Sequence, residues 1–588
     1  MPAFTNFTDL VLDRVRQHPD QDAYVFLHDD GADVRPEHLT YRELDTEARR
    51  LASWLQGRGL QGERVLMLYD HGLAFTKAFT GCLYAGAVAV PSPLPGGHGQ
   101  AFSRVTGIVR DAGVRTVLTD RASAEEVTDW LESEGLGEVE CLVTDEPGYG
   151  DPKAWRAPEI EPDDLAFLQY TSGSTSEPKG VMVSHSNLLA NEEVLSVVLG
   201  TGPEDRLGSW LPYFHDMGLI GFILHAQYLG TTLFQMAPVS FLKRPLRWLE
   251  MISRHRITVC GGPNFAYDLC TRRITDEQLA TLDLSCWKAA VNGAEPIRAS
   301  SIREFAERFA AAGFRAGAIH PGYGMAEATL GVTGSAPGVA PRVRSASAER
   351  LERDELADAA PGETSRTVVS CGRPYGFDLR IVHPETREVL PEGRVGEIWL
   401  RGASVARGYW RREEVNQEIF GALTGDGEGP FLRTGDLGVL DDGELYVTGR
   451  RKELLIFQGR NVYPQDIEQA VQSLLPALAT GPGSVFTVEA DGRDVAVVLQ
   501  EVRPRDVAGT DLEALVQTVQ WGVSREFDVP VGGVLLVRPG TVRKTTSGKI
   551  QRALMKQLFC AGEITAVQEV LTPEVARLIG RELPAAVA

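Results

Sequence analysis

Short apolar runs alternate with segments of helical periodicity along most of the chain. The runs that have the length and apolar content of buried strands are Arg64–Tyr69, Ala87–Val90, Thr116–Leu118, Thr231–Met236 and Thr258–Cys260. Apolar residues recur with the period of an amphipathic helix in Tyr41–Gln56, Leu246–His255 and Ile302–Ala312. Strands that alternate with helices are typical of sheets covered by helices. The pattern therefore predicts a large α/β body built from layered sheets.

The pattern changes towards the end of the chain. Tyr375–Arg401 consists of strand-like pieces broken by turns, which predicts a small β subdomain beside the main sheets. After about residue 452 the pattern restarts with a strand-like LLIFQG and a helix from Pro464 to about Leu475. An antiparallel hairpin in residues 484–502 and a helix over Leu512–Glu526 follow. We therefore expect an N-terminal domain, 1–451, and an α+β C-terminal domain, 452–588.

One long apolar stretch raises the question of a membrane span. Leu219–Leu242 has no Asp, Glu, Lys or Arg, but it contains His225, Gln227, Gln235 and Pro238. These residues favour a buried helix followed by a core strand, with no membrane span. The N-terminal residues lack the basic and apolar regions of a secretory signal. Seven cysteines without a CxxC pair favour free thiols in a reducing compartment, so we expect a cytoplasmic protein.

The composition excludes several classes of function. The chain has 588 residues, enough for several domains, so a single small module is excluded. There are 59 basic and 80 acidic residues, which gives a net charge of −21. Broad nucleic-acid binding needs a surplus of Lys and Arg, so we expect no such binding. A local basic pocket for a small polyanion remains compatible with this charge.

A loop rich in Gly, Ser and Thr carries the strongest local signal. Residues 168–180 read LQYTSGSTSEPKG and lie between the apolar LAFLQY and VMVSHSNLL. Small hydroxylated residues and glycine allow backbone N–H groups to approach phosphate oxygens, and Lys179 adds a positive charge. The Walker A pattern GxxxxGK[ST] is absent. By composition alone such a cluster is as often an ordinary loop, but the ordered string TSGST..PKG is far more specific.

This string resembles the phosphate-binding signature of the adenylate-forming superfamily of acyl-CoA synthetases, luciferases, peptide-synthetase adenylation domains and fatty acyl-AMP ligases. Seven further motifs follow in the family's order: LPYFHDMGLIG (211–221), NGAEP (292–296), GYGMAEAT (322–329), RTGDLG (433–438), YVTGRRKE (446–453), GRNVYPQDIE (459–468) and TTSGKIQR (545–552). The resemblance covers nearly the whole chain. It implies a large N-terminal body, a mobile C-terminal lid, and ATP and Mg²⁺ as cofactors.

The resemblance also implies a nucleotide site. Asp436 matches the carboxylate that accepts hydrogen bonds from the ribose hydroxyls, and Arg450 matches a ribose and phosphate contact. Glu327 matches the Mg²⁺ ligand, since Mg²⁺ prefers hard oxygen ligands. The ring of Tyr323 and its neighbours match the adenine slot. The remaining nucleotide-binding residues implied are Thr171, Ser172, Gly173, Ser174, Thr175, Asn292, Gly293, Ala294, Gly324 and Met325.

Two late lysines match the moving parts of the family. Lys549 in TTSGKIQR matches a catalytic lysine that enters the site with the lid and bridges the carboxylate and the α-phosphate. Without the resemblance, a lysine so late in the chain would be taken as solvated surface. Lys452 matches the hinge about which the lid rotates. An exposed lysine in a basic run is the alternative reading of Lys452.

The motifs point to a fatty acid as the substrate. Peptide-synthetase domains hold an α-amino group with an Asp directly after a Phe, whereas this chain has His215 there. His215 is therefore a candidate catalytic residue beside the carboxylate or a gate of an acyl channel; a core histidine is the alternative. We expect Gly218, Gly221 and the apolar run Leu219–Leu224 to line a tunnel for an alkyl chain.

Fatty acyl-AMP ligases, which pass the acyl group to carrier proteins, are the branch that the motifs resemble most. Glu327 and Arg373 are 46 positions apart, longer than expected in acyl-CoA synthetases. The excess includes the charged tract Arg342–Thr367. It matches the ligases' extra segment, which is thought to restrain the lid and disfavour coenzyme A. Surface loops also accept insertions at a small cost in free energy, so the length of the segment alone does not identify the branch.

The expected reaction is ATP-dependent formation of an acyl-adenylate with release of pyrophosphate, followed by acyl transfer to a phosphopantetheine thiol. Residues after Arg552 show no Asp-Ser-Leu attachment site. We therefore expect an acyl carrier protein or polyketide synthase carrier domain to act in trans. One alternative is an acyl-CoA synthetase. The other is a non-catalytic adenylate-binding protein, against which the joint presence of Lys549, Glu327, Asp436 and Arg450 argues.

Overall fold

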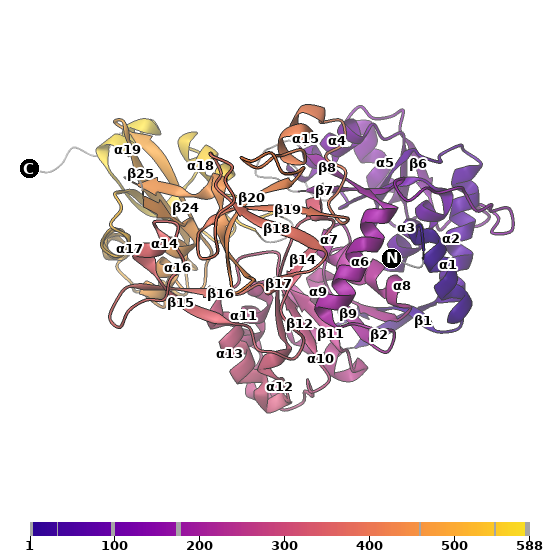
Figure 1. The fold of residues 1–588 in the computed structure, drawn as a ribbon, viewed down its shortest axis with the longest axis horizontal. Coiled ribbons are helices and arrows are strands. Elements are labelled where there is room, and N and C mark those ends of the chain that lie inside the picture. The colour runs from indigo at the N-terminus through magenta and orange to yellow at the C-terminus, as the bar shows by residue number, and fades with distance from the viewer. Residues whose placement is uncertain are drawn as a thin grey trace, which may run out of the picture.

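A computed structural model describes residues 4–31, 33–95, 100–171, 178–457, 460–545 and 549–581. Ser172, Gly173, Ser174 and Thr175, expected to bind phosphate, lie outside these ranges. Most elements up to Pro374 form two large sheets with their helices, and the C-terminal residues lie at the opposite end of the molecule (Figure 1). This arrangement confirms the predicted α/β body.

The first sheet has six strands in the order β6-β5-β3-β4-β7-β8. Its strands are β3 (Arg64–Leu68), β4 (Val88–Ser92), β5 (Thr116–Thr119), β6 (Glu140–Val143), β7 (Leu165–Thr171) and β8 (Lys179–Ser184). All pairs are parallel except β7 and β8, which pair antiparallel with Thr171 opposite Lys179. Thr171 and Lys179, which flank the Gly/Ser/Thr segment, are therefore paired in a hairpin at the edge of this sheet.

The second sheet has nine strands in the order β17-β14-β13-β12-β11-β9-β10-β1-β2. Its strands are β1 (Asp22–Asp29), β2 (Val34–Thr40), β9 (Arg206–Ser209), β10 (Thr232–Gln235), β11 (Val259–Gly262), β12 (Ala289–Asn292), β13 (Ile319–Gly324), β14 (Gly331–Gly334) and β17 (Arg373–Pro374). Strands β1 and β9 to β13 pair in parallel, with antiparallel neighbours at both edges. The expected strands at Thr231–Met236 and Thr258–Cys260 are therefore confirmed as β10 and β11.

Helices cover the sheets on both faces. They are α1 (Phe7–Gln17), α2 (Tyr41–Gln56), α3 (Leu73–Ala85), α4 (Gln100–Ala112), α5 (Ala124–Ser133), α6 (His185–Leu199), α9 (Pro238–Lys243), α10 (Leu246–His255), α11 (Asn264–Arg273), α12 (Asp276–Leu279) and α13 (Ala299–Phe309). A single apolar core joins both sheets to α2, α3 and α6. The predicted bounds of α2 and α10 are confirmed, whereas α13 begins three residues before the predicted Ile302.

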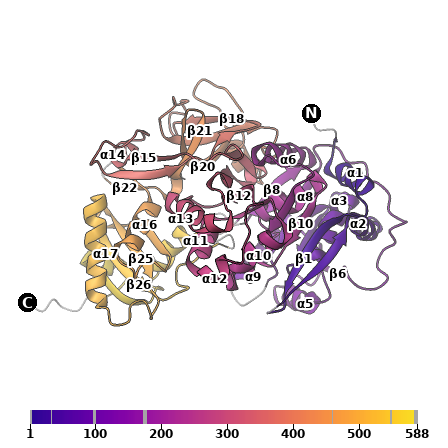
Figure 2. The same cartoon turned by 90° about the horizontal axis from the view of Figure 1, so that it is seen from below.

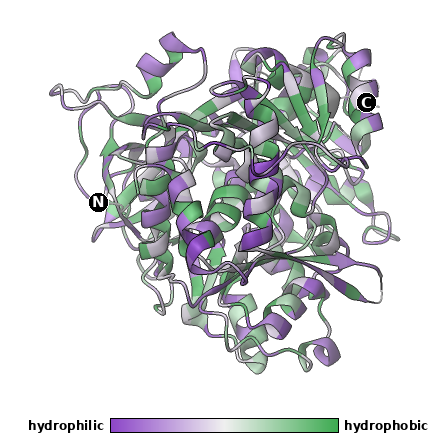
Figure 3. Ribbon diagram, turned by 90° about the vertical axis from the view of Figure 1, so that its right-hand side faces the viewer, coloured by the Kyte–Doolittle hydropathy of each residue, from purple (hydrophilic) through white to green (hydrophobic). Residues whose placement is uncertain are grey.

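The uncharged stretch from Leu219 folds as predicted into a buried helix followed by a core strand. A short α7 (Asp216–Gly218) leads into a π-helix over Leu219–Leu224 and then into α8 (His225–Leu229) and β10. Within the described ranges, no helix is long and apolar enough to cross a membrane. Figure 3 shows apolar residues gathered along the interior strands and hydrophilic residues on outer turns and helix faces.

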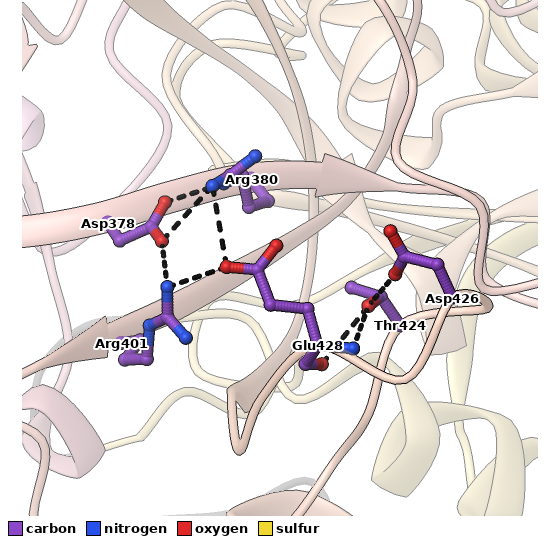
Figure 4. A network of polar contacts seen from close by, with 6 residues as sticks. All are labelled: Asp378, Arg380, Arg401, Thr424, Asp426 and Glu428. Carbon is purple, nitrogen blue, oxygen red and sulfur yellow. Dashed lines mark hydrogen bonds and ion pairs between the residues drawn. The ribbon is translucent and has the colours of Figure 1, made fainter.

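The predicted small β subdomain is a four-stranded antiparallel sheet. Its strands are β18 (Phe377–Val382), β19 (Gly396–Gly402), β20 (Leu432–Asp441) and β21 (Glu444–Arg450), and the short α15 (Glu413–Ile419) precedes β20. An ion-pair network holds the segment before β20 against this sheet (Figure 4). Arg401 on β19 contacts both Asp378 on β18, at 2.6 Å, and Glu428, at 2.8 Å. The network thus fixes the approach to the strand that carries Asp436.

The last part of the chain forms a four-stranded sheet with apolar cores on both faces. Its elements are β22 (Leu455–Phe457), β23 (Arg460–Val462), α16 (Pro464–Leu474), β24 (Gly483–Ala490), β25 (Arg493–Glu501), α17 (Leu512–Phe527), β26 (Val531–Val537), α18 (Arg552–Cys560), β27 (Ala566–Leu571) and α19 (Pro573–Leu578). The β24–β25 hairpin and both predicted helices are present. Among the described residues, both cores use only residues after Leu454. Figure 2 shows this part from below.

Candidate active site

One cavity of about 2300 Å³ brings together residues from distant parts of the chain. Its walls come from the end of β7, the start of β8 and the end of β13. The start of α7, the β20–β21 hairpin and the residues before α18 complete them. The expected site residues that line it are Thr171, Lys179, His215, Gly293, Ala294, Tyr323, Gly324, Met325, Glu327, Asp436, Arg450, Lys452 and Lys549. Asn292, which was expected in the adenine slot, is fully buried and donates a 3.3 Å hydrogen bond to Asn264.

The β7–β8 hairpin is held from one side by the segment after β19. The Trp410 N–H donates to the Gly180 carbonyl at 2.8 Å, and the Met182 N–H donates to the Gly408 carbonyl at 2.9 Å. Tyr409, between these two contacts, places its ring 5.1 Å from the Lys179 ammonium. An ammonium over an aromatic face is attracted to the ring. These contacts fix Lys179 at one end of the hairpin.

Glu327 lies in a 3₁₀ turn directly after β13. Its Oε1 accepts a 2.6 Å hydrogen bond from the Tyr409 hydroxyl, and its carbonyl accepts one from the Ala406 N–H at 2.9 Å. Burial raises the pKa of the Glu327 carboxyl, and the Tyr409 hydrogen bond opposes that rise. The side chain is thereby oriented between β13 and the segment after β19. Tyr409 was not singled out from the sequence, where it appears only as part of an apolar GYW.

Asp436 and Arg450 face each other across the β20–β21 pair. Arg450 Nε donates to Asp436 Oδ1 at 3.1 Å, and the Tyr323 hydroxyl donates to Asp436 Oδ2 at 2.9 Å. The Asp436 charge raises the pKa of the Arg450 guanidinium, and burial is the main cause of the raised pKa of Tyr323. The structure therefore brings the candidate ribose carboxylate, a cation and the candidate adenine-stacking ring into one group.

Lys549 in the C-terminal part is held by hydrogen bonds with Thr545. The Thr545 N–H donates to the Lys549 carbonyl at 2.8 Å, and the Lys549 N–H donates to Thr545 Oγ1 at 3.1 Å. Burial and the nearby Arg450 lower the pKa of the Lys549 ammonium, against the opposing charges of Asp216, Asp436 and Glu327. The ammonium of a residue late in the sequence thus lies in the field of three carboxylates of the body.

His215 and Asp216 stand at the start of α7. His215 Nδ1 is 2.8 Å from Asp216 Oδ1, which also accepts a 2.7 Å hydrogen bond from the Met217 N–H. Burial alone would raise the pKa of Asp216, but the His215 contact and the Lys549 charge bring it below the ordinary value. Sequence reasoning missed Asp216, although its signal is the acidic residue that directly follows His215 in LPYFHDMGLIG.

One wall of the cavity is apolar. It is formed by Leu195, Val198 and Leu199 on α6, by Met217, Gly221 and Phe222, and by Leu330. A Cβ atom at Gly221 would lie 3.1 Å from Leu330 Cδ2, so the glycine leaves room beside that side chain. Gly218, expected in the same wall, instead packs its Cα against the Pro212 carbonyl. From the expected run Leu219–Leu224, only Gly221 and Phe222 line the cavity within the described part of the chain.

The charged tract Arg342–Thr367 connects the body to the C-terminal part. It contains β15 (Val343–Ser347), the short α14 (Ala348–Leu351) and most of β16 (Ser365–Val369), and β15 and β16 pair antiparallel. Arg366 forms an ion pair with Asp466 on α16 at 3.1 Å. Arg366 also lies 4.3 Å from the Tyr463 ring.

A second set of contacts comes from the α14 side of the tract. Arg460 on β23 is 3.3 Å from Glu352, and Asn461 donates a 2.9 Å hydrogen bond to Asp354. The tract is therefore bound to α16 and β23 through several polar contacts. Lys452 is exposed and lies in a 3₁₀ turn between β21 and β22.

The described part of the chain contains no cluster of three or more His, Cys, Asp or Glu residues that could hold a metal ion alone. Glu327 is the carboxylate that lines the cavity beside the β7–β8 hairpin. Mg²⁺ in phosphate-transfer sites is usually held by one or two carboxylates together with substrate phosphates and water. The donor set therefore fits a Mg²⁺ ion that arrives with a nucleotide.

Comparisons with known proteins match most of the chain. Residues 11–410 match the profile of the family described as AMP-binding enzyme. The chain is 41% identical over 573 residues to the medium-chain-fatty-acid–acyl-carrier-protein ligase JamA of Moorena producens, which covers 96% of both proteins. It is 36% identical to the long-chain-fatty-acid–AMP ligase FadD26 of Mycobacterium marinum, covering 92% of this chain and 95% of that protein.

Solved structures give the same result. The crystal structure of a fatty acid AMP ligase from Legionella pneumophila matches 97% of this chain and 98% of that chain, with a TM-score of 0.76 and 35% identity. A fatty acyl-adenylate ligase from the same organism, in complex with acyl adenylate and pyrophosphate, matches with a TM-score of 0.75 and 34% identity. That match covers 97% of this chain and 98% of the other.

Proposed function

The chain belongs to the AMP-binding enzyme family, and we propose that it joins a fatty acid to ATP and then transfers the acyl group to a carrier protein. The first step yields an acyl-adenylate and pyrophosphate. In the second step, a phosphopantetheine thiol of a carrier acting in trans accepts the acyl group. One cavity is lined by Lys549, Asp216, Glu327 and Asp436, and this arrangement supports the proposal most directly.

Lys549 is the proposed catalytic residue of the first step. A carboxylate oxygen of the fatty acid attacks the α-phosphorus of ATP, and the bond to the bridging oxygen breaks, with the electron pair leaving on pyrophosphate. Because both reactants are anions, the site must neutralise charge and align them. The Lys549 ammonium does this between the carboxylate and the α-phosphate. Its lowered pKa reflects the burial that strengthens such an interaction.

The nucleotide is held by groups on both sides of the cavity. Asp436 accepts hydrogen bonds from the ribose hydroxyls, with Arg450 and Tyr323 fixing its two oxygens. The Tyr323 ring and the backbone near Gly293, Ala294, Gly324 and Met325 form the adenine slot. Thr171 and Lys179, with the segment between them, bind the phosphates. Glu327 would hold Mg²⁺, which supplies charge neutralisation between the phosphates when bound.

A fatty acid fits the apolar wall of the cavity. Each methylene that leaves water contributes about 0.8 kcal/mol, so the α6 and π-helix side chains favour an alkyl chain. His215 replaces the Asp that would bind an α-amino group, and we assign it to the carboxylate end of the acid. JamA, FadD26 and the Legionella pneumophila enzymes are named as ligases of fatty acids, which agrees with this substrate class.

The charged tract supports a carrier protein as the acceptor of the acyl group. Its contacts with α16 and β23 restrain the C-terminal part, which we take as the lid, 452–588, with Lys452 as its hinge. Rotation about this hinge would exchange Lys549 for the thiol of the second step. A restrained lid disfavours free coenzyme A. JamA is named as a ligase of an acyl carrier protein, which supports the same acceptor here. We propose a cytoplasmic location, because seven cysteines without a CxxC pair favour a reducing compartment.

Mass spectrometry of the products tests the proposed function. The purified chain is incubated with ATP, Mg²⁺ and fatty acids of graded length, with coenzyme A, with a phosphopantetheinylated carrier protein, or with neither. We expect acyl-AMP without an acceptor, acyl-carrier with the carrier protein, and little acyl-CoA. Rapid formation of acyl-CoA would make the chain an acyl-CoA synthetase. Absence of acyl-AMP with every acid would contradict the adenylation step itself.

A further inference from the structure

Arg104 lies on α4, at the edge of the cavity where the β7–β8 hairpin ends. It lines the cavity together with Tyr170, Thr171 and Lys179. One helical turn further along α4, Gly107 packs against Pro178, since a Cβ at Gly107 would lie 3.2 Å from Pro178 Cγ. Residues three apart lie on the same face of a helix. Arg104 therefore belongs to the α4 face that packs against the hairpin.

The Arg104 guanidinium has no counter-charge among the described residues. No hydrogen bond or ion pair joins it to a carboxylate in those ranges. Asp111, two turns along α4, is already engaged by Arg412 at 2.7 Å and by the Tyr170 hydroxyl at 2.7 Å. Burial lowers the pKa of Arg104. Within the described part of the chain, the protein thus holds a partly desolvated cation at the cavity wall without a paired carboxylate.

An unpaired cation in such a place is costly unless a ligand supplies the missing anion. The guanidinium fork binds phosphate oxygens in pairs, which makes arginine well suited to a polyphosphate. The groups assigned to ribose and α-phosphate, Asp436 and Arg450, belong to β20 and β21. Arg104 instead lines the cavity from α4, which packs against Pro178 of the hairpin that carries Thr171 and Lys179. Its natural partner is therefore the distal part of the nucleotide.

We propose that Arg104 binds the β- and γ-phosphates of ATP and the pyrophosphate that they become. This inference rests on the proposed function. When the bond between the α-phosphorus and the bridging oxygen breaks, the electron pair goes to pyrophosphate and its negative charge rises. Arg104 and Lys179 then flank the leaving group and stabilise that charge. Binding of the leaving group supports its departure, while Lys549 acts on the attacking side.

Direct binding tests this role on the full-length chain with inorganic pyrophosphate and AMP as separate probes in titration calorimetry. Arg104→Gln should weaken pyrophosphate and ATP binding by about tenfold or more, equivalent to about 1.4 kcal/mol. AMP affinity should stay unchanged because AMP lacks both distal phosphates. Arg104→Lys should recover part of the loss, since it keeps the charge. Arg110→Gln is the matched control, an exposed arginine on the same helix.

A readout without ligand guards against a folding defect. Since no carboxylate among the described residues pairs with Arg104, Arg104→Gln should melt at the same or a higher temperature than the wild type when no phosphate is present. Unchanged pyrophosphate affinity in Arg104→Gln would overturn the assignment, as would an equal loss of pyrophosphate and AMP binding. If Arg104→Gln loses pyrophosphate binding but the wild type forms no acyl-AMP, the proposed function fails, while Arg104 remains a residue that binds pyrophosphate.

Discussion

The Tyr409 hydroxyl donates a 2.6 Å hydrogen bond to Glu327 Oε1, and the Tyr409 ring lies 5.1 Å from the Lys179 ammonium. One side chain thereby touches both the candidate metal ligand and the end of the phosphate hairpin. Because the same segment is hydrogen-bonded to β8 on either side of Tyr409, the position of the hairpin and that of Glu327 are coupled. The segment after β19 therefore organises the phosphate side of the cavity.

Replacing Tyr409 by Phe should weaken the use of Mg²⁺ while keeping the ring. Loss of a hydrogen bond to a charged group costs about 1.5 kcal/mol, so the Mg²⁺ concentration for half-maximal adenylation should rise about tenfold. The measurement is pyrophosphate release at fixed ATP over a Mg²⁺ series. The partly exposed Tyr375→Phe is the control. An unchanged Mg²⁺ dependence in Tyr409→Phe would show that the hydroxyl does not orient Glu327.

Replacing Asp436 by Asn should reduce AMP affinity strongly. The amide keeps the shape but loses the charge that binds Arg450 and the paired acceptors proposed for the ribose. With about 1.5–3 kcal/mol for charge-assisted hydrogen bonds, AMP binding by calorimetry should weaken about tenfold to hundredfold. Asp491→Asn, at an exposed turn, should bind AMP normally. Wild-type AMP affinity in Asp436→Asn would remove the ribose assignment.

The stability of the body should fall at acidic pH through His185. This side chain is buried, its Nδ1 accepts the Phe7 N–H at 3.2 Å, and burial lowers its pKa to about 4. The unfolded chain, with an ordinary pKa of about 6.5, binds the proton first as pH falls. The stability contribution is therefore complete above about pH 6.5 and decreases by about 1.4 kcal/mol per pH unit down to about pH 4.

Urea unfolding at pH 7.5 and pH 5.0 measures this effect. In His185→Gln the difference in free energy of unfolding between the two pH values should be smaller than in the wild type by about 2 kcal/mol. An identical difference in His185→Gln and the wild type would show that His185 does not link folding to protons.

Releasing the charged tract from the lid should change the acceptor. Arg366→Ala removes the ion pair to Asp466, the Tyr463 ring contact and a 3.0 Å hydrogen bond to the Thr448 carbonyl. We expect acyl-CoA formation to rise several-fold while the rate of acyl-AMP formation stays the same. Arg353→Ala is the matched control, since Arg353 is exposed and pairs with Glu349 inside the tract. Unchanged acyl-CoA formation in Arg366→Ala would separate the tract from acceptor choice.

Local patterns predicted the elements well where burial and periodicity coincide. α2 and α10 have apolar stripes along their whole length, and their observed bounds are the predicted ones. β3 is a continuous buried run, as parallel strands are. The π-helix at Leu219–Leu224 could not be predicted, because a run that is buried on all sides shows no period. For the same reason, the tunnel-facing residues of that run could not be separated from the others.

The site was predicted through ordered motifs, and contacts between distant segments had to come from the structure. Asp436 and Arg450 were expected at the nucleotide from their motifs, and the structure pairs them across β20 and β21. Tyr409, Asp216 and Arg104 were not singled out from the sequence. Tyr409 matters because it contacts Glu327, and Asp216 because it lies in the field of Lys549. Arg104 matters because no carboxylate in the described ranges pairs with it. Contacts between residues that are so far apart in the sequence cannot be predicted from a short segment of it.

The proposed adenylation step depends most on Lys549, and single-turnover adenylation measures the role of this residue directly. Purified wild type, Lys549→Ala and the exposed control Lys153→Ala are mixed with ATP, Mg²⁺ and the preferred fatty acid, and acyl-AMP is quantified over time. Loss of one preorganised charge at the reacting centre should slow acyl-AMP formation by about 100-fold or more, with AMP affinity and folding unchanged. Wild-type rates of acyl-AMP formation in Lys549→Ala would contradict the account.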